Sequence, residues 1–123
     1  MGGQLALIVE DDYDLSMIFA QALEEAGFRT QIVRTGDTAL MWLASEVPAV
    51  VVLDLHLPRV GGTDILRRIR DDARLDETKV IVVTADANLA SSLDEGANLV
   101  LIKPVSYSQL RDLSERLAAK DAS

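Results

Sequence analysis

Five short apolar runs recur along the chain, and the stretches between them have a different period. Most of the runs are rich in β-branched residues and do not alternate with polar ones, which is typical of strands covered on both faces of a sheet. The second run is weaker and more polar, which favours an edge strand. The predicted strands are Leu5–Val9, Thr30–Val33, Val50–Leu53, Val80–Val83 and Leu99–Ile102.

Between these runs, apolar residues recur every three or four positions, as expected for helices with one buried face. Gly27 is well placed to end the first helix, and Pro48 to stop the second. We interpret Arg67, Arg68 and Arg70 as the solvated face of the third helix. The apolar stripes are Leu15, Ile18, Phe19, Ala22 and Leu23; Leu40, Leu43, Ala44 and Val47; Ile65, Leu66 and Ile69; Leu89, Ala90 and Leu93; and Leu110, Leu113 and Leu117.

Strict alternation of strands and helices over 123 residues predicts a single α/β domain with a parallel sheet. Right-handed crossovers cover both faces of the sheet only if the strand order reverses. The flavodoxin-like order 2-1-3-4-5 places the first and third strands together at the point of reversal. We therefore predict a doubly wound five-stranded sheet with five helices on two faces, and one domain over residues 4–120 with no second domain in this chain.

Composition narrows the possible functions. The net charge of −8 argues against direct binding of nucleic acid, which requires basic side chains to neutralise phosphates. The absence of cysteine excludes disulfides, thiolate metal sites and a cysteine nucleophile. No apolar stretch approaches the roughly 18 residues of a membrane span. We expect a cytoplasmic protein that does not enter a membrane.

Carboxylates follow two of the predicted strands. Glu10 and Asp11 come directly after the first strand, and Asp54 comes directly after the third. If these strands are neighbours, the carboxylates share one pocket. Two of them about 4 Å apart repel by roughly 4 kcal/mol at an effective dielectric of 20, so the pocket needs protons or a cation. Hard oxygen ligands favour Mg²⁺.

A structural role is the alternative for part of this cluster. Asp11, Asp12 and Asp14 lie where the first helix begins, and carboxylates there cap the helix and interact favourably with its dipole. We expect Asp12 and Asp14 to be caps and solvated surface.

Two further polar residues fall on the same edge of the sheet. Thr84 ends the fourth apolar run, and Lys103 follows the fifth. An aspartate can attack phosphorus, Mg²⁺ can neutralise the phosphoryl oxygens, and lysine and threonine can bind the remaining oxygens. Together the four strand ends carry the groups needed for phosphoryl transfer to Asp54.

These segments resemble those of the receiver domains of bacterial two-component response regulators, which share the fold of the chemotaxis response regulator. The resemblance covers about Leu5 to Leu117. The matching segments, in order, are Val9-Glu10-Asp11-Asp12, Asp54-Leu55-His56-Leu57-Pro58 with Gly62, Thr84-Ala85, and Lys103-Pro104.

The resemblance implies a role for each residue of the acidic pocket. Asp54 would be the phosphoacceptor. Glu10 and Asp11 would hold Mg²⁺ together with Asp54, and the backbone carbonyl of His56 would complete the metal shell. The bond between Lys103 and the following proline would be cis, as X-Pro bonds permit at modest cost.

For the phosphoryl group, the resemblance implies binding by Thr84, the backbone N–H of Ala85, and Lys103. The donor would be a phosphohistidine on a sensor histidine kinase or phosphotransfer protein. The domain would not be a conventional enzyme, because it catalyses only its own phosphorylation and slow dephosphorylation. It would switch conformation to signal to an output domain or effector, as a monomer or weak homodimer.

Several positions depart from the usual pattern of these domains. Val100 stands where an aromatic residue usually couples to the hydroxyl of the fourth strand, and Val105 where phenylalanine is frequent. Between Thr84 and Gly96 the chain is roughly one helical turn short, so the fourth helix should be short or irregular. The two positions that commonly tune phosphorylation hold His56 and Asp86.

The sequence leaves three alternatives to a phosphorylation-dependent receiver. The chain could be a degenerate receiver that binds partners without phosphorylation, which the altered position of Val100 favours. It could be an aspartate-nucleophile phosphatase similar to the haloacid dehalogenases, although these place Asp-x-Asp after the first strand and this chain has Glu10-Asp11-Asp12. Nucleotide binding is disfavoured by the absence of both common glycine-rich phosphate motifs.

Overall fold

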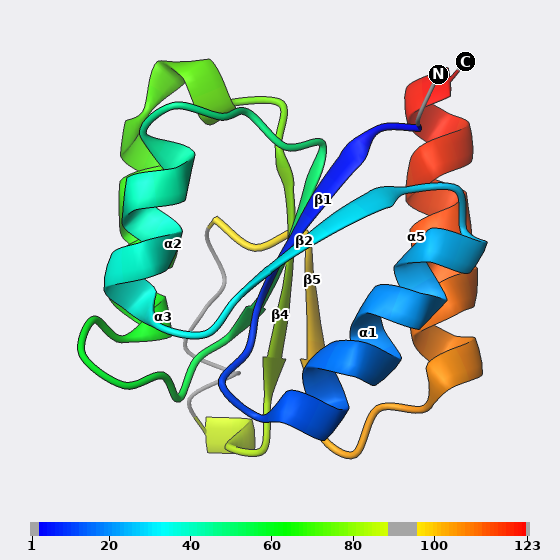
Figure 1. Ribbon diagram of the computed structural model, residues 1–123, viewed down its shortest axis with the longest axis horizontal. Helices are drawn as coiled ribbons and strands as arrows, with labels where there is room; N and C mark the ends of the chain where they lie inside the picture. Colours follow the sequence, from blue (N-terminus) through cyan, green and yellow to red (C-terminus); the bar gives the residue numbers. More distant parts are fainter. Residues whose placement is uncertain (1–2, 89–95, 123) are drawn as a thin grey trace.

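The computed structural model describes residues 3–88 and 96–122, which form a parallel sheet between two layers of helices (Figure 1). The strand order is β2-β1-β3-β4-β5, which confirms the predicted order 2-1-3-4-5 and the edge position of the second strand. The strands are β1 (Leu5–Val9), β2 (Arg29–Val33), β3 (Val50–Asp54), β4 (Lys79–Thr84) and β5 (Leu99–Ile102). Every bound lies within one residue of the predicted one.

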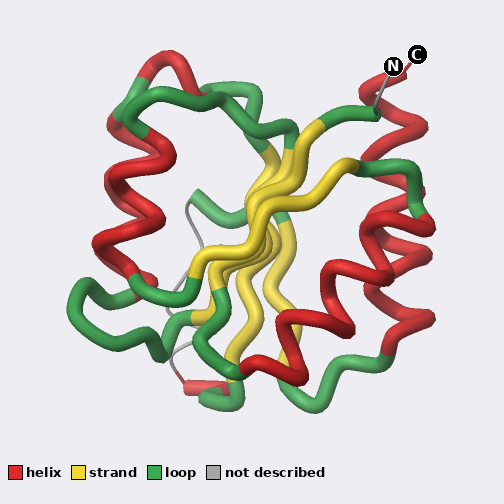
Figure 2. The backbone as a smooth tube through the Cα atoms, viewed as in Figure 1, coloured by secondary structure: helices red, strands yellow, loops and turns green. Residues whose placement is uncertain are grey.

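The helices cover both faces of the sheet, as Figure 2 shows with helices in red and strands in yellow. In Figure 1, α1 (Tyr13–Glu25) and α5 (Tyr107–Ala122) lie on one side, and α2 (Gly36–Leu43) and α3 (Gly62–Asp71) on the other. A short 3₁₀ helix, η1 (Ala73–Leu75), follows α3. The described residues thus contain four of the five expected α-helices. Residues 87 and 88 are helical, but the predicted stripe of Leu89, Ala90 and Leu93 lies outside the described residues.

Both faces of the sheet are covered by helices and are therefore apolar. Successive side chains of each strand point alternately to the two faces. In β1, Leu7 and Val9 join the apolar cluster on the side of α2 and α3, and Ala6 and Ile8 join the cluster on the side of α1 and α5. All five residues of β3 are buried. A strand buried on both faces has no position that faces solvent, so apolar residues do not alternate with polar ones. This explains the continuous apolar runs in the sequence.

The end of α1 follows the prediction closely. Gly27 has a positive φ of 102°, a conformation that glycine adopts without a Cβ penalty. The Phe28 N–H donates to the Leu23 carbonyl at 3.0 Å, and the Gly27 N–H donates to the Glu24 carbonyl at 3.0 Å. This is the Schellman arrangement, which satisfies carbonyls at the helix end and returns Phe28 to the core.

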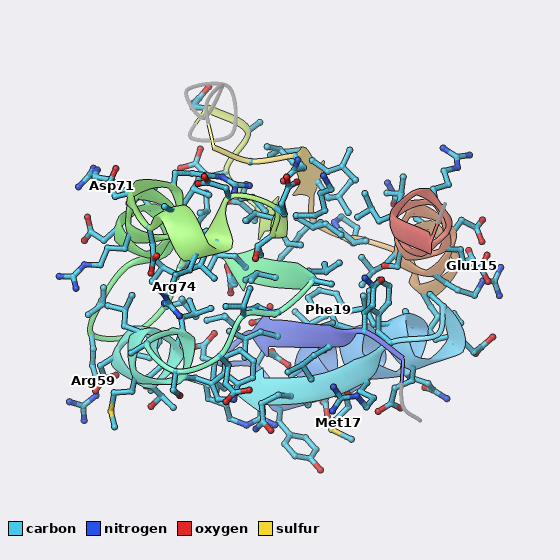
Figure 3. The ribbon with its side chains drawn as sticks, turned by 90° about the horizontal axis from the view of Figure 1, so that it is seen from above. Met17, Phe19, Arg59, Asp71, Arg74 and Glu115 are labelled. Atoms are coloured by element: carbon cyan, nitrogen blue, oxygen red, sulfur yellow. The ribbon has the colours of Figure 1, made fainter. Side chains whose placement is uncertain are left out.

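Three of the described residues in the predicted helical stripes are exposed, namely Ile18, Ala44 and Val47. Ile18 on α1 is 40% exposed, whereas Phe19 beside it is 2% exposed. Figure 3 shows Phe19 in the interior and Met17 on the outside of α1. Val47 is 54% exposed, because α2 ends at Leu43. The helix therefore ends before Pro48, which does not stop it as predicted. Arg74 donates to the Leu43 carbonyl at 2.8 Å and so supplies a partner where the helix ends.

The interpretation of the arginines on α3 was correct for two of the three. Arg67 and Arg68 are exposed, as predicted. Arg70 is half-buried, and its Nε donates to the Gly96 carbonyl at 2.6 Å. Periodicity did not indicate this contact, because the two residues are brought together only by the packing of α3 beside the segment that enters β5.

Among the described residues, no helix has the length and apolar character needed to cross a membrane.

The first turn of α3 packs directly against the end of β3. Gly62 is buried, and a Cβ atom at this position would lie 2.5 Å from both the Asp54 carbonyl oxygen and the Leu55 Cα. The Gly62 N–H donates to the Leu55 carbonyl at 3.1 Å. The backbone carrying Asp54 is therefore held at a distance that only glycine allows.

We predict that Gly62→Ala destabilises the protein by about 1–3 kcal/mol, because the methyl group forces α3 away from β3. Gly61→Ala is the matched control, since a Cβ there meets no atom within 4 Å. That substitution should change stability by less than about 1 kcal/mol. The measurement is the free energy of unfolding from urea titration. Equal stability of the two variants would contradict the proposed close approach.

Candidate functional site

The predicted site residues meet at the carboxyl ends of the strands, the lower edge of the sheet in Figure 1. Glu10 follows β1, Asp54 ends β3, Thr84 ends β4 and Lys103 follows β5. The register of neighbouring strands aligns their carboxyl ends, so the residues at these ends lie at about the same height along the strands. The aligned pairs are Val9 with Leu53, Asp54 with Val83, and Thr84 with Ile102.

Three carboxylates form the acidic part of the site. Oxygen atoms of Glu10, Asp11 and Asp54 lie within 4.8 Å of one another. Glu10 is 1% exposed and Asp54 4% exposed, whereas Asp11 is exposed. Asp12 caps α1 by accepting the Leu15 N–H at 2.9 Å, as expected. The structure thus separates two neighbouring aspartates that the sequence could assign either to capping or to the pocket.

Lys103 places one ammonium group between two of these carboxylates. Its Nζ lies 3.4 Å from Asp54 Oδ2 and 3.5 Å from Glu10 Oε1. The other oxygen of Asp54 accepts the His56 N–H at 3.0 Å, and the other oxygen of Glu10 accepts the Asp12 N–H at 3.2 Å. Each buried carboxylate is therefore hydrogen-bonded, but one ammonium cannot balance three carboxylates.

The burial of Glu10 beside Asp54 changes its pKa. Burial, reinforced by a hydrogen bond with Asp54, raises the pKa of Glu10 from 4.5 to about 7. Lys103 opposes the shift, but less strongly. In the metal-free protein, a proton on Glu10 thus relieves part of the repulsion. A hard divalent cation can replace that proton, and the three carboxylate oxygens fit the ligand preference of Mg²⁺.

Thr84 lies fully buried at the end of β4. Its hydroxyl oxygen accepts the Asp86 N–H at 3.1 Å, and its carbonyl accepts the Lys103 N–H at 2.9 Å. A hydroxyl that accepts one hydrogen bond can still donate its own proton. Ala85, between Thr84 and Asp86, is exposed in the turn. The hydrogen bond between the Lys103 N–H and the Thr84 carbonyl therefore connects the end of β4 directly to Lys103.

The remaining predicted positions lie around this centre. His56 and Asp86 are exposed, and each contributes a backbone N–H to the site. Val100 is half-buried and packs against the apolar cluster on the α2 and α3 side. The Lys103-Pro104 bond is cis, as expected. Sequence reasoning missed the Asp12 N–H that binds Glu10, because no side-chain pattern reports a backbone donor.

We predict that the metal-free protein loses stability through Glu10 as the pH rises. A carboxyl whose pKa rises to about 7 on folding contributes stability that is complete below its unfolded pKa of 4.5 and is lost through pH 7. In chelator, the melting temperature of wild type should fall relative to Glu10→Gln between about pH 5 and pH 8. Mg²⁺, which competes with the proton, should stabilise wild type more at the higher pH.

The control is Glu46→Gln, which removes an exposed carboxyl and should keep the wild-type pH dependence. An identical pH dependence for wild type and Glu10→Gln would show that the buried carboxyl does not titrate in this range.

Comparisons with known proteins agree with the geometry. The family model of the response regulator receiver domain matches residues 6–115. The probable methanogenesis regulatory protein FilR2 of Methanothrix harundinacea is 33% identical, over 92% of this chain and 80% of that protein. The transcriptional regulatory protein AfsQ1 of Streptomyces coelicolor is also 33% identical over 92% of this chain, which spans 49% of the length of AfsQ1.

One solved structure has a metal in the corresponding fold. The receiver domain of the sensor histidine kinase PA1611 from Pseudomonas aeruginosa PAO1 aligns with a TM-score of 0.84 and 26% identity, covering 96% of this chain and 99% of that one. It has a magnesium ion coordinated in its active site cleft. The family match over most of the chain confirms the expected resemblance, and the chain belongs to the response regulator receiver domains of two-component signalling systems.

Proposed function

We propose that this chain is a phosphorylation-dependent switch in which Asp54 accepts the phosphoryl group. The observation that carries the proposal is the placement of one buried aspartate beside an ammonium group and two further carboxylates. Asp54 has one oxygen fixed by the His56 N–H and the other facing Lys103. Membership in the receiver family supports the same reaction.

Glu10, Asp11 and Asp54 are the residues proposed to hold Mg²⁺, together with the backbone carbonyl of His56. Their donor chemistry supports this, since the carboxylate oxygens lie within 4.8 Å of one another and carry more negative charge than Lys103 balances. The magnesium site of the PA1611 receiver domain supports it by similarity. When bound, Mg²⁺ would neutralise negative charge on the phosphoryl oxygens.

The proposed transfer uses the carboxylate of Asp54 as the nucleophile. An oxygen of Asp54 forms a bond to phosphorus while the bond from phosphorus to the donor nitrogen breaks. The electron pair of that bond returns to the donor imidazole, which takes a proton from water. His56 holds the second oxygen of Asp54 through its backbone N–H, which keeps the carboxylate oriented during attack.

After transfer, Lys103 would exchange the carboxylate of Asp54 for an oxygen of the phosphoryl group. Thr84 would donate its hydroxyl proton to a second oxygen, and the backbone N–H of Ala85 to a third. Each charge-assisted hydrogen bond is worth about 1.5–3 kcal/mol. Two new ones supply roughly 3–6 kcal/mol, against the roughly 5.5 kcal/mol needed to move an equilibrium from 1:99 to 99:1.

Receiver domains of response regulators act with histidine kinases and output domains. We propose a sensor histidine kinase or phosphotransfer protein as the phosphoryl donor, and an output domain or effector protein as the target. We further propose that the domain covers residues 4–120, works in the cytoplasm, and is a monomer or weak homodimer. Its net charge of −8 argues against direct binding of nucleic acid by this domain.

A constitutive interaction module is the second candidate function. Val100 favours it, because a half-buried valine cannot make the in-or-out movement of the aromatic residue usual at this position. The complete set of Glu10, Asp11, Asp54, Thr84 and Lys103 favours the switch.

We predict that a small phosphodonor such as acetyl phosphate adds one phosphoryl group to the wild-type protein in the presence of Mg²⁺. Asp54→Asn should remove the reaction, because an amide is not a nucleophile toward phosphorus. Asp64→Asn, an exposed carboxylate in the first turn of α3, should react like wild type. The measurement is intact mass with and without chelator. Equal labelling of Asp54→Asn and wild type would exclude Asp54 as the acceptor.

A second prediction separates a switch from a constitutive module. Beryllofluoride with Mg²⁺ mimics an aspartyl phosphate and should raise the melting temperature of wild type and change its amide spectrum. Asp54→Asn should show neither effect. Phosphorylation without any conformational response, or no response of any kind in wild type, would favour the constitutive module.

A further inference from the structure

Arg70 differs from the other arginines on α3 in being anchored at three points. Its Nε donates to the Gly96 carbonyl at 2.6 Å, its Nη2 to Asn98 Oδ1 at 2.9 Å, and its Nη1 to the Leu75 carbonyl at 3.4 Å. The guanidinium therefore connects α3 with η1 and with the segment that enters β5. An arginine fork held by three acceptors is fixed in a way that a solvated side chain is not.

The backbone at Gly96 allows this close packing. Gly96 has a positive φ of 96°, and a Cβ there would lie 3.1 Å from Arg70 Cγ and 3.4 Å from Leu66 Cγ. The side chain of Arg70 thus lies against a position without a side chain of its own. The segment before β5 is held against α3 both by hydrogen bonds and by contact with the stem of the arginine.

Asn98 connects this anchor to the sheet. Its N–H donates to the Val80 carbonyl at 2.9 Å, and its side-chain Oδ1 accepts the Val80 N–H at 2.7 Å. Both backbone groups of Val80 that face β5 are therefore satisfied by one residue. The same Oδ1 accepts the hydrogen bond from Arg70, which holds the amide in the orientation that Val80 requires.

The pairing of Asn98 with Val80 precedes the first aligned pair of β5 with β4, Leu99 with Ile81. β5 has only four residues and, among the described strands, pairs with β4 alone, so its register depends on one line of pairing. A slip by one residue would move the strand about 3.3 Å and turn every side chain to the opposite face. The anchor of Arg70 and Asn98 opposes such a slip from the start of the strand.

Lys103 lies directly after the other end of β5. Its Nζ lies 3.4 Å from Asp54 Oδ2 and 3.5 Å from Glu10 Oε1, so a shift of the strand would change both contacts. We propose that Arg70 and Asn98 are positioning residues for Lys103, which set the register of β5 and so place the ammonium group at the phosphoryl-binding site. This inference rests on the proposed function, because Lys103 is there assigned to the phosphoryl group.

The inference makes a distinction that a general structural role does not. Mg²⁺ would be held by residues at the ends of β1 and β3, none of which lies on β5. Beryllofluoride, bound as a phosphoryl mimic, would need Lys103 as well. Weakening the anchor should therefore reduce the affinity for beryllofluoride and leave the affinity for Mg²⁺ largely intact.

The test compares Arg70→Met and Asn98→Leu with wild type in two titrations followed by calorimetry, Mg²⁺ alone and beryllofluoride at saturating Mg²⁺. We expect beryllofluoride to bind about tenfold more weakly, since displacements near 1 Å can cost up to 10²-fold. Mg²⁺ affinity should not fall by more than about twofold, because moving the Lys103 ammonium removes no metal ligand. Arg70→Lys, which keeps the charge but loses the fork, gives the same readout if Arg70→Met does not fold.

Two further variants serve as controls. Asn98→Asp keeps an acceptor for both Val80 and Arg70 and should bind beryllofluoride like wild type. Arg68→Met removes an exposed arginine from the same helix and should also be neutral.

Unchanged beryllofluoride affinity in Arg70→Met and Asn98→Leu would overturn the inference. An equal loss of both affinities together with a lower melting temperature would also overturn it, since that is the signature of a purely structural role. Absence of any beryllofluoride response in wild type would instead refute the proposed function, and the inference with it.

Discussion

The repulsion between carboxylates at one end of a parallel sheet is the constraint on which the rest of this structure depends. Glu10 and Asp54 are both buried, and they share a single ammonium group. Carboxylate oxygens within 4.8 Å of one another repel, so a rigid framework and counter-charges are needed to hold them together. The apolar strands β1 and β3, covered on both faces, supply that framework, and Lys103, protons or a cation supply the counter-charge.

The same constraint supports the proposed switch. A pocket in which three carboxylates share one ammonium is stabilised by a bound cation. In the proposed reaction, the phosphoryl group would then bring new acceptors for Lys103 and Thr84. The backbone already joins these two residues, because the Lys103 N–H binds the Thr84 carbonyl. In the proposed switch, a change in the partners of one residue would reach the other through this hydrogen bond, without an aromatic residue at position 100.

The supports of the site come from segments that are far apart in the chain. Gly62 brings α3 against the backbone of Asp54, and Arg70 on the same helix binds the segment that enters β5. One helix thus contacts both the strand that carries the aspartate and the segment that leads to the lysine. α3 thus supports two parts of the site, a role that its exposed Arg67 and Arg68 do not suggest.

The sequence by itself determined the strands, their order and the chemistry at their ends. A continuous apolar run can be buried only as a covered strand, and a carboxylate such as Asp54 that ends the run must lie at the sheet edge. Only the tertiary structure decided which neighbouring residues have which role. Asp11 joins the carboxylates while Asp12 caps α1, Ile18 and Val47 remain exposed, and Arg70 is anchored rather than solvated. These outcomes depend on distances between segments remote in sequence, which local periodicity does not encode.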